Sequence, residues 1–153
     1  MTWVKHGYGW LRDNRAMRPP IERSALPDAE SIARLVDAFY DKVRVDPVIG
    51  PIFNEAVHDW PEHKRLLTSF WCSVVLRAQT YRGNPMQAHR PWPIEARHFD
   101  HWIALWKQTA SEHMPEAEAA TMGQFAERIG QSLRYGLGLQ GGATPLRVPI
   151  SSL

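Results

Sequence analysis

The sequence predicts an all-α protein of four main helices, with a long irregular segment between the second and the third. Apolar residues recur every three or four positions in four stretches, which is the period of a helix face. No stretch alternates apolar and polar residues as a half-buried strand does. The length of 153 residues fits one domain. We expect that domain at residues 25–138, between an N-terminal arm at 1–24 and a flexible tail at 139–153.

The first helix is predicted from about Asp28, a good N-cap residue, to Val45. It ends before Pro47, because the residue that precedes a proline disfavours helix. Residues 47–51 are expected to form a turn, followed by the apolar pair at 52–53. The predicted inward face of this helix consists of Ile32, Leu35, Val36, Phe39, Tyr40 and Val43.

The second helix is predicted at about residues 60–78, with Asp59 and Glu62 forming a start that resembles a capping box. The third is expected at 93–113 and the fourth at 116–137, separated by Pro115 and ended by Gly136 and Gly138. The inward residues are expected to be His63, Leu66, Leu67, Phe70, Trp71 and Val74 in the second helix, Ile94, His98 or Phe99, Trp102, Leu105, Trp106 and Thr109 in the third, and Ala119, Met122, Phe125, Ala126, Ile129 and Leu133 in the fourth.

Composition argues against several classes of protein. The formal net charge is +2, and residues 1–24 hold five basic and two acidic side chains. The rest of the chain therefore carries a charge of about −1, which gives little support for nucleic-acid binding. The single cysteine, Cys72, excludes an internal disulfide and a cysteine-based zinc site, and this fits a cytoplasmic protein. No stretch approaches the roughly 20 apolar residues of a membrane span, and none near the start resembles a signal peptide.

His89 lies on a short segment with a proline on each side. Pro85 suits the first position of a helix, and Pro91 is expected to force Arg90 out of the α region and so to stop the helix. About one helical turn remains, which is too short to be stable alone. An imidazole at the end of so constrained a turn suits a ligand to a metal or a metal cofactor.

Three side chains with polar groups lie on otherwise apolar helix faces: Tyr40, His63 and Trp102. Taken alone, each is ordinary, since a buried Tyr or Trp commonly finds one hydrogen-bond partner and a lone inward His is more often a core residue than a ligand. Together with His89 they predict a pocket in which a few polar groups converge within an apolar lining.

The other histidines and carboxylates favour structural roles. His98 and His101 have helical spacing, but two histidines without a third ligand are a weak zinc signal, and we expect packing or solvated roles for both. No nucleophile elbow, phosphate-binding loop or zinc-protease helix motif is present.

Several short motifs follow one another between about residues 28 and 137. They are Phe39-Tyr40-Asp41-Lys42-Val43, Gly50-Pro51-Ile52-Phe53-Asn54, Trp60-x-x-His63-Lys64, Phe70-Trp71, Tyr81-x-Gly83-x-Pro85-x-x-x-His89 and Trp102. In order and approximate spacing this set resembles the group III truncated haemoglobins. The Gly-Gly hinges typical of other truncated-globin groups are absent.

The resemblance implies a truncated, two-over-two globin fold, in which two antiparallel helix pairs enclose haem b. It implies that His89 is the proximal ligand of the haem iron, and that Tyr40, His63 and Trp102 lie on the distal side. The further residues expected to bind the cofactor are Phe39, Phe53, Leu67, Phe70, Trp71, Met86, Arg90, Trp92 and Phe99. Cationic partners for the haem propionates are expected among Lys64, Arg65, Arg82 and Arg90.

The residue chemistry agrees with that implication. Tyr40 and Trp102 can each donate a hydrogen bond to a small ligand, worth about 1–1.5 kcal/mol, or roughly tenfold in affinity. This favours tight binding of O₂, NO, CO or cyanide and redox chemistry, detoxification or sensing over bulk O₂ transport. Peroxidase-like turnover is one hypothesis, and His63 is left open as a donor, a gate or an iron ligand.

The alternative interpretation is a haem-free helical interaction or sensory module, in which His89 only packs. For the haem protein, the expected partners are diatomic gases and a reductase. The expected state is a monomer or a weak dimer.

Overall fold

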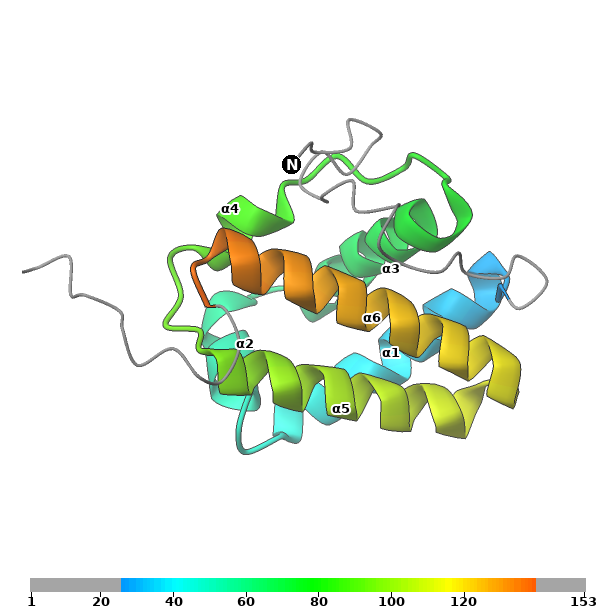
Figure 1. Ribbon diagram of the computed structural model, residues 1–153, viewed down its shortest axis with the longest axis horizontal. Coiled ribbons are helices and arrows are strands. Elements are labelled where there is room, and N and C mark those ends of the chain that lie inside the picture. The colour runs from blue at the N-terminus through cyan, green and yellow to red at the C-terminus, as the bar shows by residue number, and fades with distance from the viewer. Residues whose placement is uncertain (1–25, 140–153) are drawn as a thin grey trace, which may run out of the picture.

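The structure, a computed structural model, describes residues 26–139, and these residues form six α-helices and no strand (Figure 1). The all-α class predicted from the sequence is therefore confirmed. The helices are α1 (Ala29–Val45), α2 (Gly50–Ala56), α3 (Trp60–Leu76), α4 (Pro85–His89), α5 (Ala96–His113) and α6 (Glu116–Gly136). The predicted arm, and the predicted tail beyond Leu139, lie outside the described residues.

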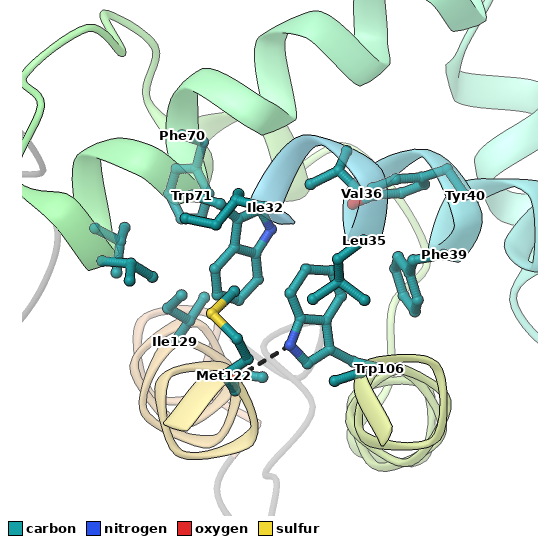
Figure 2. Packing of buried hydrophobic residues seen from close by; sticks show 14 of the residues in the cluster. Ile32, Leu35, Val36, Phe39, Tyr40, Phe70, Trp71, Trp106, Met122 and Ile129 are labelled. Atoms are coloured by element: carbon teal, nitrogen blue, oxygen red, sulfur yellow. Dashed lines mark hydrogen bonds between the residues drawn. The ribbon is translucent and has the colours of Figure 1, made fainter. Parts of the chain in front are cut away.

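Two helix pairs form the body of the domain. Figure 1 shows α5 and α6 side by side along their lengths, with α1 and α3 behind them. The short helix α2 packs on α1, and α4 packs on the C-terminal part of α6. Between the two pairs lies one apolar core, to which α1, α3, α5 and α6 all contribute (Figure 2).

The four long helices begin where local chemistry places their N-termini. The Asp28 carboxylate accepts a hydrogen bond from the Ser31 backbone N–H at 2.8 Å, and Asp59 accepts one from Glu62 at 3.1 Å. Both are N-cap bonds of the kind the sequence predicts. The third helix starts three residues later than expected, at Ala96, because the side chains of Glu95 and His98 form a capping box there.

The helix α2 was not predicted, since its seven residues were expected to be a turn and an apolar pair. The Asp46 carboxylate accepts hydrogen bonds from the backbone N–H groups of Val48 and Ile49, which orders the turn before this helix. Gly50 then brings α2 against α1, because a Cβ at this position would lie 2.8 Å from the Val43 carbonyl oxygen. Such a close approach depends on tertiary packing rather than on local pattern.

One predicted core position was wrong. Leu66 was expected to face inward on the second helix, but it is 38% exposed. Among the helices that the structure describes, none is long and apolar enough to cross a membrane.

Candidate functional site

The short helix α4 presents His89 at its last position. The Asn84 side chain caps the helix by accepting from the Gln87 N–H at 3.1 Å, and Pro85 occupies the first turn. The ring of His89 donates from Nδ1 to the Pro85 carbonyl oxygen at 2.5 Å. A carbonyl can only accept, so Nδ1 carries the proton and Nε2 keeps its lone pair. Burial also lowers the pKa of His89, against the opposing effect of this hydrogen bond, which favours the neutral imidazole that a metal requires.

The end of α4 corrects one expectation. Arg90 was predicted to leave the α region because it precedes a proline, but its φ of −56° and ψ of −41° are helical. The preference against helix before proline is a bias that one residue can overcome. The chain instead turns away through a hydrogen bond from the Trp92 N–H to the His89 carbonyl oxygen, at 3.3 Å.

The segment before α4 is fixed to α3 by Ser69, which hydrogen-bonds to Thr80, and by Ser73. The Ser73 hydroxyl oxygen accepts from the backbone N–H groups of Thr80 and Tyr81, each at 3.0 Å. The Tyr81 ring then packs edge-on against Phe70, with ring centroids 5.2 Å apart. These contacts hold the start of α4 against the C-terminal half of α3.

The first turn of α4 also packs on α6. Met86 is buried, and its thioether fills the space beside Gly136, where a Cβ would overlap it. The glycine therefore leaves room for this contact between α4 and α6.

Tyr40 lies on α1 facing α3 and α5, and it is 2% exposed. Its ring meets that of Phe39 edge-on at 4.9 Å. Burial raises the pKa of Tyr40, although a hydrogen bond with Trp102 acts the other way, so the phenol keeps its proton at neutral pH. Tyr40 and Trp102 are thus brought together, as the expectation of a shared pocket requires.

His63 enters the same region from α3. Its imidazole is surrounded by three aromatic rings in edge-on contacts, those of Tyr40 at 5.3 Å, Trp60 at 5.5 Å and Phe53 at 6.4 Å. Burial and the charge that His89 can carry lower the pKa of His63 to about 4, so it is neutral at pH 7. Its Nε2 is buried and has no hydrogen-bond partner among the residues the structure describes.

The remaining predicted cofactor residues differ in their contacts and in their burial. Phe99 lies beside His89, with ring centroids 6.3 Å apart, and Phe53 packs against Tyr40 at 5.7 Å. Trp71 is fully buried in the core, where it stacks on Trp106. The others are placed as follows: Leu67 and Trp92 are half-buried, Met86 is buried, and Arg90 is exposed.

Two of the cations expected to meet haem propionates have other partners. Lys64 Nζ lies 2.8 Å from the Asp37 carboxylate and 2.7 Å from that of Asp41, which ties α3 to α1. Arg65 pairs with Glu62 on the same helix. Arg82 and Arg90 are exposed and remain candidates.

The histidine pair of α5 has structural roles. His98 Nδ1 accepts from the Glu95 N–H at 2.8 Å, and His101 Nε2 lies 2.7 Å from the Asp46 carboxylate. Across residues 26–139, no three His, Cys, Asp or Glu side chains come together as a metal-ion site. These contacts agree with the packing or solvated roles expected for His98 and His101.

The residues around His89 and His63 fit a flat, apolar, iron-containing group. The donor set is one neutral imidazole with a free Nε2, opposed by a second imidazole whose buried Nε2 lacks a partner. The apolar side chains nearby are only partly buried, as those of Phe53, Leu67, Ile94 and Trp102 illustrate. Haem would cover this surface, with His89 Nε2 as the candidate iron ligand and His63 Nε2 available to a ligand, a proton or the iron.

Sequence reasoning missed Trp60 as a wall of the His63 pocket. The signal was available, because Trp60 precedes His63 by three positions and so shares its helix face. It also missed the stacking of Trp71 on Trp106, since each residue was assigned to an inward face without a partner.

Comparison with known proteins gives one consistent result. Residues 25–130 match the family described as bacterial-like globin. A curated relative, the group 3 truncated hemoglobin ctb of Campylobacter jejuni, is 39% identical over 87 residues, which span 52% of this chain and 67% of that protein. The group 2 truncated hemoglobin YjbI of Bacillus subtilis is 31% identical over 88 residues, covering 56% of this chain and 65% of its own length.

A solved structure supports the same assignment. The crystal structure of the group III truncated hemoglobin from Campylobacter jejuni superposes with a TM-score of 0.69 at 33% identity, and the match covers 76% of this chain and 96% of that one. Globins bind haem and, through it, diatomic gases. The chain belongs to the bacterial-like globins and, within them, to the group III truncated haemoglobins.

Proposed function

We propose that this globin holds haem b through His89 and binds O₂ and other small ligands tightly on the opposite side, beside Tyr40, Trp102 and His63. The observation that carries the proposal is the convergence of these three side chains from α1, α5 and α3 in one aromatic pocket. Each comes from a different long helix, so its position is set by the domain core.

Haem would supply an iron that His89 could hold through Nε2 and that could also bind an exchangeable small ligand. The chain does the rest. The Pro85 carbonyl fixes the orientation and tautomer of His89 through Nδ1. The Tyr40 hydroxyl oxygen accepts from the Trp102 indole N–H, so its own proton is free for a bound ligand, to which Trp102 can also turn its N–H; each such bond contributes about 1–1.5 kcal/mol. Such donors slow ligand release, which favours redox chemistry, detoxification or sensing over bulk O₂ transport.

A peroxidase-like reaction is the second candidate function, favoured by His63. Its imidazole is neutral at pH 7 and has a buried Nε2 without a partner in the described part of the chain. It can therefore take a proton from a peroxide and return it to the leaving oxygen. Peroxide turnover by the ferric protein should exceed that of free haemin and fall in His63→Leu; equal rates for all three would contradict this role.

Absorbance spectroscopy of the ferric, ferrous and CO-bound protein tests the main proposal. We expect a strong Soret band in all three forms and a five-coordinate ferrous spectrum before CO is added. A preparation that takes up no haem would refute the proposal and would support the haem-free module instead.

A further inference from the structure

Three tryptophans form a stack that leads from the proposed ligand pocket into the core. Trp102 contacts the pocket through Tyr40, and Trp71 and Trp106 are fully buried. We propose that this tryptophan stack is a one-electron reservoir, which returns an electron to the haem group after a peroxide has oxidised it. The inference rests on the proposed haem site and goes beyond ligand binding.

The geometry of the stack favours electron exchange among its members. The rings of Trp71 and Trp106 lie 4.2 Å apart between centroids at an angle of 13°. Trp102 is 6.2 Å from Trp71 and 6.1 Å from Trp106, at angles of 19° and 16°. All three planes are thus nearly parallel, whereas every other aromatic contact of these residues that we describe is edge-on. Parallel ring faces allow the positive charge of a radical cation to spread over more than one indole.

Packing alone does not account for the choice of tryptophan at position 71. The indole N–H of Trp71 is buried and has no acceptor among the residues the structure describes. An unpaired buried donor costs free energy, and Leu or Phe would fill the core without it. Figure 2 shows the contrast with Trp106, whose N–H donates to the Met122 carbonyl oxygen of α6 at 3.2 Å.

These surroundings select indole over phenol as the electron donor. An oxidised phenol is a very strong acid and must lose its proton at once, so Tyr40 could give up an electron only together with its proton. An oxidised indole is a much weaker acid and can persist as a radical cation. The bond from Trp106 to the Met122 carbonyl becomes charge-assisted when the stack is oxidised, which stabilises the positive charge.

The electrons balance with a peroxide as the oxidant. Reduction of hydrogen peroxide, H₂O₂ + 2H⁺ + 2e⁻ → 2H₂O, removes two electrons from the haem group. The stack gives one electron back through Trp102 and becomes a radical cation, shared mainly by Trp71 and Trp106. No bond to an indole forms or breaks. A small reductant such as ascorbate then supplies two electrons, one to the stack and one to the haem group, and both return to their starting state.

Electron paramagnetic resonance of the haem-loaded protein, frozen shortly after mixing with hydrogen peroxide, tests the proposal. We expect an organic radical whose signal narrows when the protein is made with ring-deuterated tryptophan and is unaffected by ring-deuterated tyrosine. This arm uses the natural sequence and so needs no variant to fold. A radical that responds to the tyrosine label, or the absence of any organic radical while peroxide is consumed, would overturn the proposal.

Substitutions then locate the radical. Trp71→Phe and Trp106→Phe should each lose most of the tryptophan signal, while Trp60→Phe should keep it. Trp60 is the matched control because it is buried and its ring centroid lies 6.0 Å from that of Tyr40, but it is outside the stack. An unchanged signal in Trp71→Phe and Trp106→Phe, with a normal Soret band and circular dichroism, would exclude the stack.

The experiments distinguish a failure of the tryptophan reservoir from a failure of the proposed ligand site. Trp106→Phe should leave the rate of O₂ dissociation unchanged while removing the radical. Weak O₂ binding by the natural protein, with the tryptophan radical present, would refute the ligand site alone. Tight O₂ binding without the radical would refute the reservoir alone.

Discussion

The two sides of the proposed haem site are built in opposite ways. The distal side consists of α1, α3 and α5, which are 17, 17 and 18 residues long and place Tyr40, His63 and Trp102 from their packed faces. The proximal side is the five-residue helix α4 within an irregular segment, which contacts Ser73 before the helix and Gly136 in its first turn. The comparison implies that the distal side depends on global stability, whereas the proximal side can open locally.

The largest expected effect comes from the core behind the distal side. Phe39 is fully buried and meets Tyr40 and Trp106 edge-on, each at 4.9 Å. Phe39→Ala should lower the free energy of unfolding by about 3–5 kcal/mol, as measured by urea denaturation. Val45→Ala, at an 83% exposed position of the same helix, is the control. Equal losses in the two variants would show that α1 is not the support of the distal side.

A smaller and more local effect is expected on the proximal side. Gly136→Ala should force the Met86 side chain aside, displace α4 and weaken the hold on haem by about 1–3 kcal/mol. The measurement is the rate of haem transfer to an excess of apomyoglobin. Gly123→Ala is the matched control on the same helix, because its Cβ would meet only the flexible Lys107 chain, at 3.3 Å. Identical rates in the two variants would contradict the role given to Gly136.

The next effect distinguishes ligand release from haem retention. Tyr40→Phe and Trp102→Phe each remove one donor, so O₂ should dissociate about tenfold faster from each variant, for a loss of about 1–1.5 kcal/mol. Haem loss should remain at the wild-type rate, since neither variant touches α4. Stopped-flow dissociation in excess CO measures the first rate. O₂ dissociation at the wild-type rate in both variants would contradict the donor roles given to Tyr40 and Trp102.

The smallest effect concerns acid stability at the turn between α1 and α2. Burial would raise the pKa of Asp46, but hydrogen bonds from His101, Ile49 and Val48 outweigh it and lower the pKa below 3.8. Asp46 therefore contributes stability above the ordinary carboxyl pKa, and this is lost as the pH falls through the lowered value. Asp46→Asn should make unfolding less steeply dependent on pH below about pH 4, by about 1 kcal/mol or less. An unchanged pH profile would exclude this contribution.

The sequence was most informative where local chemistry determines structure. Pro85 and the spacing to His89 predicted a one-turn helix that ends at the histidine, and the structure has it at Pro85–His89. Period and N-caps likewise predicted α1 and α3 to within about two residues at each end. In these cases the determining contacts join residues only a few positions apart.

Features that depend on contacts between distant segments were not predictable. The helix α2 requires Gly50 to lie close to the carbonyl groups of α1. No local sequence pattern predicts this close contact between the two helices. Only the structure identifies the Pro85 carbonyl oxygen as the acceptor for His89 Nδ1. The stack of Trp71 on Trp106 joins α3 to α5, and periodicity can assign each to a buried face without pairing them.

The most direct test of the central claim is imidazole rescue of His89→Gly. We assign the bond to the haem iron to the free Nε2 of His89, whose imidazole α4 holds in place. His89→Gly should lose the five-coordinate ferrous haem spectrum and regain it when free imidazole is added. A His89→Gly protein that keeps the wild-type ferrous spectrum without imidazole would contradict the account.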